Sequence, residues 1–465
     1  MGPCSLATLA TLATIGAFFL AVPGHAYAET LLTAYHEALA RDPVLAQARA
    51  QLVEDRAGEP LARSALYPHL GAAASVGENR AHVTGIGLPI LTDYLSDTYS
   101  LTLTQPLFNG QALSAMDMAD NQVRQGEAAL AAAQQNLIVA VTRAYFGVLQ
   151  AQALARVARH QRHLLVGLYR QAKAFLAVGT GDVIAVQEAR ADCDAATASL
   201  ILAQNAVAVA RQELKQLTHS PVTALWDVGR IQPQLPHPDR MEPWVAMALR
   251  NQPLLRQAKA DLKTAQAAVR YHERAGWPTL TIQMVAQHGL GELLPGVEVN
   301  QMGASINLFF PIYQGGGISA ATGQAQAAVS VSQNRLRHVR DDIRLQTETA
   351  FLNMQTSVAQ MQASSQALAA ARISLAGTRK GYQVGTRSFI DVLTVATQYA
   401  AAERSYEVAL YNQIMARVEL KAAVGVLKPR DVLAINALLT NRPHKGSIGA
   451  AQHFAKSQAS RLERP

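Results

Sequence analysis

The sequence predicts an α+β membrane protein in which an internal duplication supplies two pairs of β-strands and two very long α-helices. Three observations lead to this prediction: stretches that alternate in polarity with a period of two, long stretches without proline, and the recurrence of both in the same order in each half of the chain. Charged residues make up only 16 % of the chain. This is below the usual quarter and suits helices that pack closely on one another.

Residues 1–28 are predicted to be a secretory signal peptide. An apolar run without charged residues leads to Ala26 and Ala28, the small residues expected before the cleavage point. The mature chain would keep Cys193 as its single cysteine, so we expect no internal disulfide. Beyond the signal no 18-residue stretch is continuously apolar, so we expect a closed barrel, and not a helix, to cross the membrane.

The chain repeats itself. The first repeat covers 29–220 and the second 239–427, with a proline-rich linker over 221–238. The remaining residues, 428–465, are predicted to be a short equatorial segment followed by a disordered basic tail. This tail carries no nucleic-acid-binding motif, so we expect no nucleic-acid partner. The two copies align at matching positions: Pro43 with Pro253, Tyr67 with Trp277, Pro68 with Pro278, Pro106 with Pro311, and Gly179 with Gly385.

In each copy, two stretches alternate between apolar and polar residues, which predicts strands with one apolar face. The apolar positions expected to face lipid are Leu101, Leu103, Leu280, Ile282, Ile306 and Leu308. Polar neighbours such as Thr102 and Asn307 would line a lumen. The turn-rich stretches 78–98 and 287–301 are predicted to be the hairpin loops between the strands. On pattern alone, a soluble sheet packed on a helical bundle remains an alternative.

The longest helices are predicted over 110–177 and 315–382, where no proline occurs. Each would be about 100 Å long at 1.5 Å per residue. Shorter return helices are predicted over 182–218 and 388–427. A coiled-coil seam with a seven-residue period is indicated by Val392, Tyr399 and Tyr406.

Strand number sets the expected assembly. Two strands per copy give four per chain, and four strands cannot close a barrel in lipid. Eight strands from two chains leave a lumen too narrow for transport, whereas twelve from three chains leave a hollow one. The fold class predicted is therefore a trimeric 12-stranded membrane β-barrel, continued by a long α-helical coiled-coil barrel.

Residues 382–393 read Tyr-Gln-Val-Gly-Thr-Arg-Ser-Phe-Ile-Asp-Val-Leu, and 178–180 repeat the Val-Gly-Thr of this motif. With the Pro-x-aromatic-x-Gly junctions at Pro106 and Pro311, these motifs resemble the TolC-like outer-membrane factors, the outer membrane efflux proteins. The resemblance covers about 29–427. It implies a homotrimer whose 12-stranded β-barrel lies in the outer membrane and whose long α-helical coiled-coil barrel crosses the periplasm. This trimer would serve as the passive exit duct of a tripartite efflux pump or type I secretion system.

The resemblance also implies partners. An inner-membrane transporter, either ABC-type or proton-driven, would supply the energy. A periplasmic adaptor (membrane fusion) protein would dock on the helix-pair turns. The docking residues implied are Gly179, Thr180, Gly181, Gly385 and Thr386.

A periplasmic gate is implied in the same way. In the family a Tyr, an Arg and an Asp link the inner coiled coils, and Tyr382 and Arg387 match the first two. The Asp expected in the first copy falls at Ala185, and Asp182 is one turn away as a possible substitute.

The family can also carry two acidic rings at the narrowest point. Asp391 matches one ring, and Thr394 stands where the second would be. An ordinary surface pair of Arg387 with Asp391, four residues apart, is the alternative interpretation of these charges.

No catalytic constellation, cofactor site or metal site is predicted. His160 and His163 lie three residues apart, but no carboxylate or cysteine lies within one turn to complete a site. Two other classes remain open: a non-conducting coiled-coil scaffold of the cell envelope, and a periplasmic enzyme with a site that the sequence does not reveal.

Overall fold

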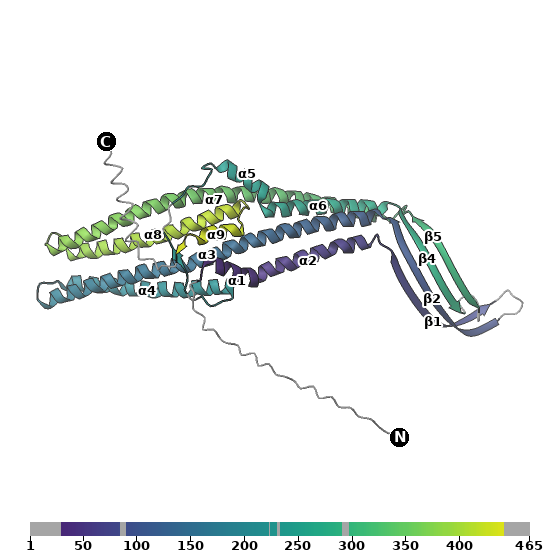
Figure 1. Cartoon of the computed structure of the whole chain (residues 1–465), viewed down its shortest axis with the longest axis horizontal. Coiled ribbons are helices and arrows are strands. Elements are labelled where there is room, and N and C mark those ends of the chain that lie inside the picture. The colour runs from purple at the N-terminus through teal and green to yellow at the C-terminus, as the bar shows by residue number, and fades with distance from the viewer. Residues whose placement is uncertain (1–28, 84–89, 223, 230–232, 291–296, 441–465) are drawn as a thin grey trace, which may run out of the picture.

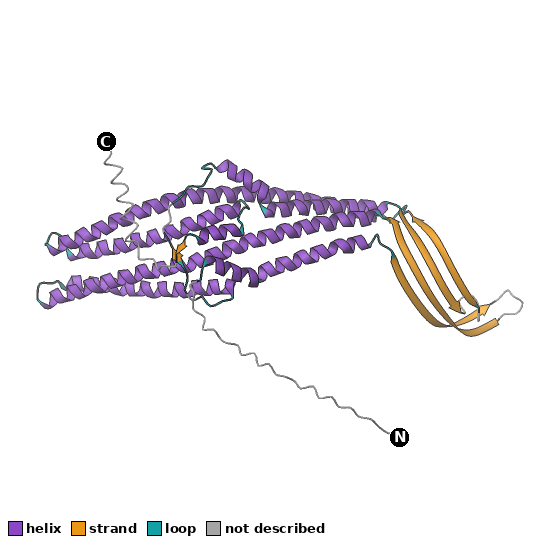
Figure 2. Ribbon diagram, in the orientation of Figure 1, coloured by secondary structure: helices purple, strands orange, loops and turns teal. Residues whose placement is uncertain are grey.

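The computed structural model describes residues 29–83, 90–222, 224–229, 233–290 and 297–440. They form a long molecule with a β-sheet at one end and helices along the rest (Figures 1 and 2). The predicted signal peptide 1–28, the basic tail after residue 440 and the apices of both hairpins lie outside the described residues.

The two repeats contain the same elements in the same order. The first repeat comprises α1 (Leu31–Arg41), α2 (Pro43–Ser64), β1 (His69–Val83), β2 (Ile90–Phe108), α3 (Gly110–Ala177) and α4 (Val183–Thr218). The second comprises α5 (Met241–Asn251), α6 (Pro253–Glu273) and a 3₁₀ turn η1 (Arg274–Gly276), then β4 (Thr279–Leu290), β5 (Glu298–Phe309), α7 (Gly317–Gln383) and α8 (Phe389–Ala423). Between and after the repeats lie β3 (Asp227–Val228), α9 (Pro429–Asn436) and β6 (Leu439–Thr440).

The predicted long helices are present, and α3 and α7 contain 68 and 67 residues. The return helix α8 is shorter than predicted. It ends at Ala423 because Gly425 adopts a left-handed conformation with φ of 75°, which closes the last turn.

The four long strands form one antiparallel sheet in the order β1-β2-β4-β5. The prediction that 78–98 and 287–301 are loops was wrong, because β1 and β2 remain paired as far as Val83 and Ile90, and β4 and β5 as far as Leu290 and Glu298. Alternation of polarity stops in these outer segments, so the sequence lacks the signal of a half-buried strand there. The backbone pairing continues, and a two-point ion pair between Arg80 and Asp93 links β1 to β2.

Helix α3 is the centre of the helical part and contacts α2, α4, α6 and α8. Two described helices, α3 and α4, are long and apolar enough to cross a membrane by length and composition alone. Over half of the apolar window of α3 is buried by neighbouring helices, whereas only 11 % of that of α4 is. Packing within the chain therefore accounts for the apolar character of α3 but leaves an apolar surface on α4.

The core near the middle of the helices fixes the linker between the repeats. The Tyr145 hydroxyl is 3.0 Å from the carbonyl oxygens of both Glu29 and Trp226, which share its single proton as acceptors. Burial raises the pKa of Tyr145, so it remains a neutral donor. Around it, α9 and the small sheet of β3 and β6 complete a core that includes Leu31, Leu45, Phe146, Leu214, Tyr411, Leu427, Val432 and Leu439.

In both repeats, the end of the return helix is hydrogen-bonded to the start of the same repeat, but different residues make this contact. In the first copy, the Arg41 guanidinium donates to the carbonyl oxygens of Thr218 and His219 at the end of α4. In the second copy, the side-chain amide of Gln252 donates to the carbonyl oxygens of Ala422 and Ala423 at the end of α8. A Cβ on Gly425 would lie 2.6 Å from the Gln252 Cα, so this contact requires glycine.

Replacing Gly425 by alanine is expected to destabilise the protein by about 2 kcal/mol, because the left-handed backbone is strained by a Cβ and the Gln252 backbone must move. Thermal unfolding of the detergent-extracted protein measures this. The matched control is Gly377→Ala within α7, where the added Cβ would meet no atom within 4 Å. Helix propensity there predicts a gain of about 1 kcal/mol. Equal effects of the two changes would contradict the proposed role of Gly425.

Candidate functional site: the helix tips and the sheet

Two equivalent turns connect the helix pairs α3/α4 and α7/α8 at the end of the molecule opposite the sheet (Figure 1). Gly179 and Gly385 adopt left-handed conformations with φ of 78° and 79°. In each turn the following threonine amide donates to a carbonyl oxygen five residues back, at 3.0 Å for Thr180 and 2.8 Å for Thr386. This is the Schellman arrangement that ends a helix at a glycine. Beside these glycines the side chains of Val178 and Val384 are 71 % and 74 % exposed, a feature that the sequence analysis did not single out.

The two turns differ by an exchange of large and small residues. In the first copy Phe175 is large and Gly181 is small; a Cβ on Gly181 would lie 2.5 Å from the Leu176 amide nitrogen. In the second copy the aligned positions are Gly381 and Arg387, and a Cβ on Gly381 would lie 2.8 Å from the Arg387 Cγ. The stem of Arg387 therefore lies directly over Gly381. The sequence analysis missed Gly381, although the alignment of the repeats contains the exchange.

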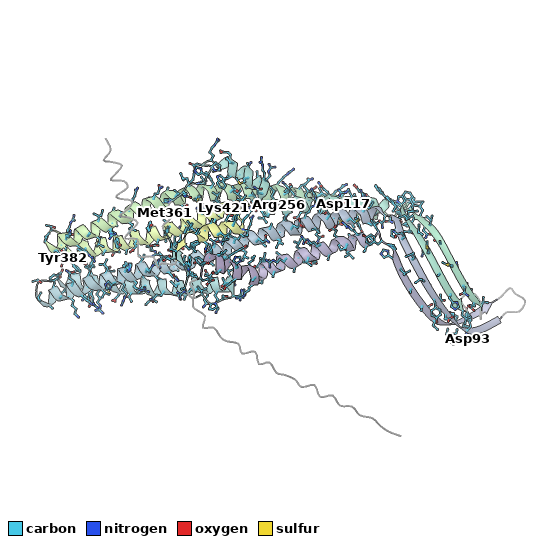
Figure 3. All side chains as sticks on the ribbon, viewed as in Figure 1. Asp93, Asp117, Arg256, Met361, Tyr382 and Lys421 are labelled. Carbon is cyan, nitrogen blue, oxygen red and sulfur yellow. The ribbon has the colours of Figure 1, made fainter. Side chains whose placement is uncertain are left out.

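Tyr382 connects the two helix pairs near their tips (Figure 3). Its ring is 6.5 Å from Phe175 of α3 and 5.7 Å from Phe389 of α8, centroid to centroid, with edge-on geometry in both contacts. The surrounding apolar cluster includes Ala185, the position where the family resemblance implies an Asp. Tyr382 therefore belongs to the same cluster as the expected partner position, but the side chain there is a methyl group.

Asp391 begins α8 as part of a capping box. Its carboxylate accepts a hydrogen bond from the Ser388 amide at 3.0 Å, and the Ser388 hydroxyl accepts one from the Asp391 amide at 3.1 Å. The hydrogen bonds from Ser388, followed by the nearby positive charge of Arg387, lower the pKa of Asp391. Asp391 is thus ionised at neutral pH and held at a defined position by its own helix.

The other two polar candidates are engaged locally as well. The Asp182 side chain accepts a hydrogen bond from the Ile184 amide at 3.0 Å and caps α4. Thr394 donates its hydroxyl to the Ile390 carbonyl oxygen at 3.0 Å. Among the described residues, no group of three or more His, Cys, Asp or Glu side chains could hold a metal ion.

The structure places the six predicted lipid-facing residues on one face of the sheet. Paired residues of neighbouring strands share a face, and the register pairs Leu280 with Leu308 and Ile282 with Ile306. The next rows contain Leu70, Leu103, Met284 and Ala304, and then Ala72, Leu101, Ala286 and Met302. The opposite face carries mainly polar or small side chains, among them Thr102, Thr104, Gln283, Ser305 and Asn307, with Val285 and Phe309 as apolar exceptions.

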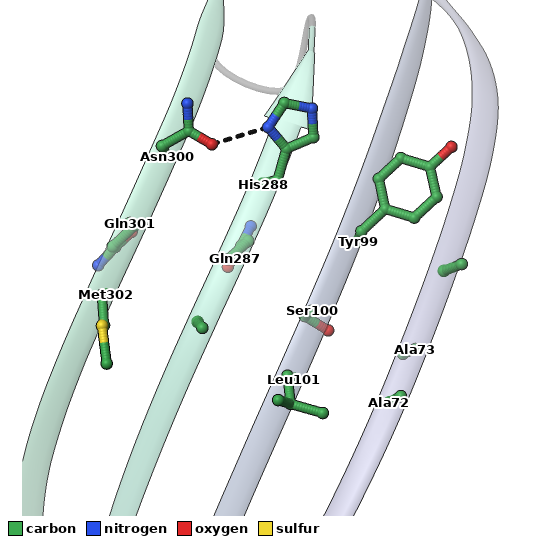
Figure 4. Close-up of a pocket in the computed structure, with 12 residues that line it drawn as sticks. Ala72, Ala73, Tyr99, Ser100, Leu101, Gln287, His288, Asn300, Gln301 and Met302 are labelled. Carbon is green, nitrogen blue, oxygen red and sulfur yellow. Dashed lines mark hydrogen bonds between the residues drawn. The ribbon is translucent and has the colours of Figure 1, made fainter.

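Aromatic and polar side chains border this apolar face at both ends. Towards the hairpin tips, Tyr99, His288 and Asn300 lie abreast across three strands (Figure 4). The His288 ring stacks on Tyr99 with centroids 6.1 Å apart, and its Nδ1 is 2.8 Å from the Asn300 Oδ1. Towards the helices, Phe108 stacks on Trp277 at 6.3 Å. An apolar band between two such borders is typical of a barrel that spans a membrane.

Comparison with known proteins identifies the family. The sequence profile of the family described as "Outer membrane efflux protein" matches residues 34–219 and 244–426, which are the two repeats. Outer membrane protein TolC of Vibrio cholerae is 28 % identical over 424 residues, covering 88 % of this chain and 94 % of that protein. Alkaline protease secretion protein AprF of Pseudomonas aeruginosa is also 28 % identical, over 91 % of this chain and 90 % of that protein. The crystal structure of the Campylobacter jejuni CmeC outer membrane channel shares the fold, with a TM-score of 0.77, 16 % identity, and coverage of 89 % of this chain and 90 % of that one.

The chain therefore belongs to the outer membrane efflux protein family. Membership confirms the predicted resemblance, the fold class with four strands per chain and a helical barrel, the outer-membrane location and the role as an exit duct of efflux or type I secretion systems. The family is one of transport channels, so the scaffold and enzyme alternatives lose their basis. The gate, the docking turns and the repeat boundaries remain predictions.

The capping box predicts a local effect at the tip. Ser388→Ala removes the hydroxyl that accepts from the Asp391 amide and is expected to destabilise the first turn of α8 by about 1 kcal/mol. Hydrogen exchange of the amides at 390–392 should accelerate about fivefold. Thr394→Ala, one turn further along α8, is the control and should leave these amides as protected as in the parent protein.

Proposed function

We propose that three copies of this chain form a closed tube, a passive exit duct whose periplasmic end is opened by partner proteins. The observation that carries this proposal is the pair of free sheet edges. Strands β1 and β5 lie at the two edges of the described four-stranded sheet. Because β1 and β5 run in opposite directions, β5 of one copy can pair antiparallel with β1 of the next. Three copies then complete a 12-stranded barrel with no edge in lipid.

The helical surface supports the same assembly. Exposed apolar side chains lie along α4 and α7. They include Ile184, Ile201, Leu202 and Val209 on α4, and Val331, Leu345, Leu352 and Ile373 on α7. Contact with neighbouring copies would bury them.

The tips are the proposed docking place for the periplasmic adaptor. The Val178 and Val384 side chains project beside the turns formed by Gly179, Thr180, Gly181, Gly385 and Thr386. Two similar turns in each chain would give a trimer six similar docking points. The duct itself uses no energy; an ABC or proton-driven transporter in the inner membrane would supply it.

The proposed gate consists of Tyr382, Arg387 and Asp391 on the second helix pair. Three Asp391 carboxylates around a threefold axis would form a ring that attracts cations. Arg387, whose stem lies over Gly381, would link one helix pair to its neighbour. Opening would then move α7/α8 relative to α3/α4, a switch between two packings of the same helices.

The first test is the native mass of the protein extracted from outer membranes in detergent. Three copies in an elongated particle support the tube. A monomer or dimer that is soluble without detergent would overturn the proposal, because neither could close the sheet in lipid.

The gate predicts two separable effects on single-channel current. Arg387→Ser should increase conductance several-fold, because it removes a link that holds the tips together. Asp391→Asn should reduce cation preference without fraying α8, because the amide oxygen still accepts from Ser388.

The control for both is Arg190→Ser on α4, which removes a surface arginine paired with Asp194 at 3.9 Å near the tip of the first copy. It should leave current and selectivity as they are. If both gate variants behave like this control, the constriction lies elsewhere.

A further inference from the structure

A group of buried charges lies between the two helix pairs, away from the tips. On α8, Glu403 and Glu407 are only 7 % and 6 % exposed. They are one helical turn apart and both face α3. Two carboxyl groups buried side by side repel each other and lose their hydration, so an arrangement of this kind needs a compensating partner.

The compensating partner is Arg156 of α3. Its guanidinium is 3.5 Å from the Asp227 carboxylate on β3, and its charge opposes the burial that raises the pKa of Tyr411 on α8. It also attracts Glu407. Arg156 thereby connects the first repeat, the linker strand and the second repeat.

Several acids gather at this interface. Arg156 is paired with Asp227 and attracts Glu407, and His160 of α3 attracts Glu403. Tyr406 and Tyr411 of α8 are the other titratable neighbours of Glu407. Burial raises the pKa of Glu407 to about 7; Arg156 opposes this, and the charges of Glu403 and Asp227 reinforce it. Burial likewise raises the pKa of Glu403, against the attraction of His160.

We propose that the buried Glu407 is a proton-sensitive latch: its neutral form lets α8 pack against α3 in the closed duct, and loss of its proton favours release because the attraction of Arg156 only partly offsets the cost of burying the charge. This inference rests on the proposed gate, because it assumes that opening moves α7/α8 away from α3/α4. All three gate residues belong to that second pair. The latch lies about 24 Å from Asp391 along α8, at 1.5 Å per residue over 16 residues. The interface that holds the latch is therefore one that must loosen when the tip moves.

The sign of the pH effect follows from the two environments of Glu407. In the packed, closed state its pKa is about 7. In the open state water reaches the carboxyl group, and its pKa returns to the ordinary value of 4.5. The closed state therefore binds more protons between these two values. Acid favours closure, and the closed-to-open equilibrium shifts towards open by up to about tenfold per pH unit for each chain as the pH rises through this range. Asp391 does not interfere, because its pKa is lowered and its titration lies below this range.

The test is single-channel recording of the full-length protein in planar lipid bilayers between pH 5 and pH 8. The parent protein should open more as the pH rises. Glu407→Gln keeps the size and neutral form of the protonated acid, so its conductance should stay low and independent of pH. Glu403→Gln removes one charge that repels Glu407, so the pH midpoint of channel opening should be lower in this variant than in the parent. Glu213→Gln, an exposed acid on α4, is the matched control and should follow the parent profile.

The outcomes separate the latch from the gate. If Glu407→Gln and Glu403→Gln both titrate like the parent while Arg387→Ser still increases conductance, the latch is overturned and the gate stands. If Arg387→Ser and Asp391→Asn both behave like the Arg190→Ser control, the gate itself is wrong, and the latch loses its basis with it. If Glu407→Gln does not assemble, Glu403→Gln alone decides the test. A pH midpoint of opening equal to that of the parent then overturns the latch.

Discussion

A β-sheet within a bilayer has no water to hydrogen-bond its edge strands, and much of this molecule follows from that constraint. Strands β1 and β5 leave two free edges, and only further copies of the chain can pair with them without exposing backbone to lipid. Because β1 and β5 run in opposite directions, the sheet can continue from one chain to the next with every neighbouring pair of strands antiparallel. The number of chains that close the ring of strands also fixes the number of helices that continue from its rim. The barrel therefore sets the number of helices in the tube. Once the chains are arranged in a ring, the apolar surface of α4 can pack against a neighbouring chain.

Duplication provides the frame, and the differences between the copies provide the function. Both helix-pair turns use the same hydrogen bonds and the same left-handed glycine. Each turn therefore forms from residues of its own repeat. The first copy has Phe175 and Gly181 where the second has Gly381 and Arg387. The first copy thus presents a ring that contacts Tyr382 of the second, and the second presents a guanidinium whose stem lies over Gly381. The charged candidates of the gate thus gather on α7/α8, while α3/α4 retains apolar and capping contacts.

The periodicity of the sequence and the positions of glycine and proline were sufficient to predict the long helices, the strand order within each repeat and the turns, because each depends on local backbone preferences. The limits of the hairpins were not predictable in this way. Beyond Gly77, polarity no longer alternates, and the strands are held by backbone pairing and by the Arg80–Asp93 ion pair. The contact between Gly425 and Gln252, and the grouping of Arg156 with Asp227 and Glu407, join residues far apart in sequence. Such groupings depend on the packing of complete helices, and no spacing within a segment indicates them.

Long helices explain why a small change near the middle of the molecule could control its tip. A helix pair that rotates by about 10° around a point 24 Å from its end moves that end by about 4 Å, taking 1.5 Å of length per residue. Packed helix interfaces occupy discrete arrangements and do not deform continuously, so such a rotation is a switch and not a gradual bend. In the proposed gate, the apolar contacts of Tyr382 help to hold the tips together, and the buried acids of α8 set how much that arrangement is favoured. The packed interface would keep the duct closed, and the buried carboxyl groups would lower the free energy of release once a partner begins to separate the helix pairs.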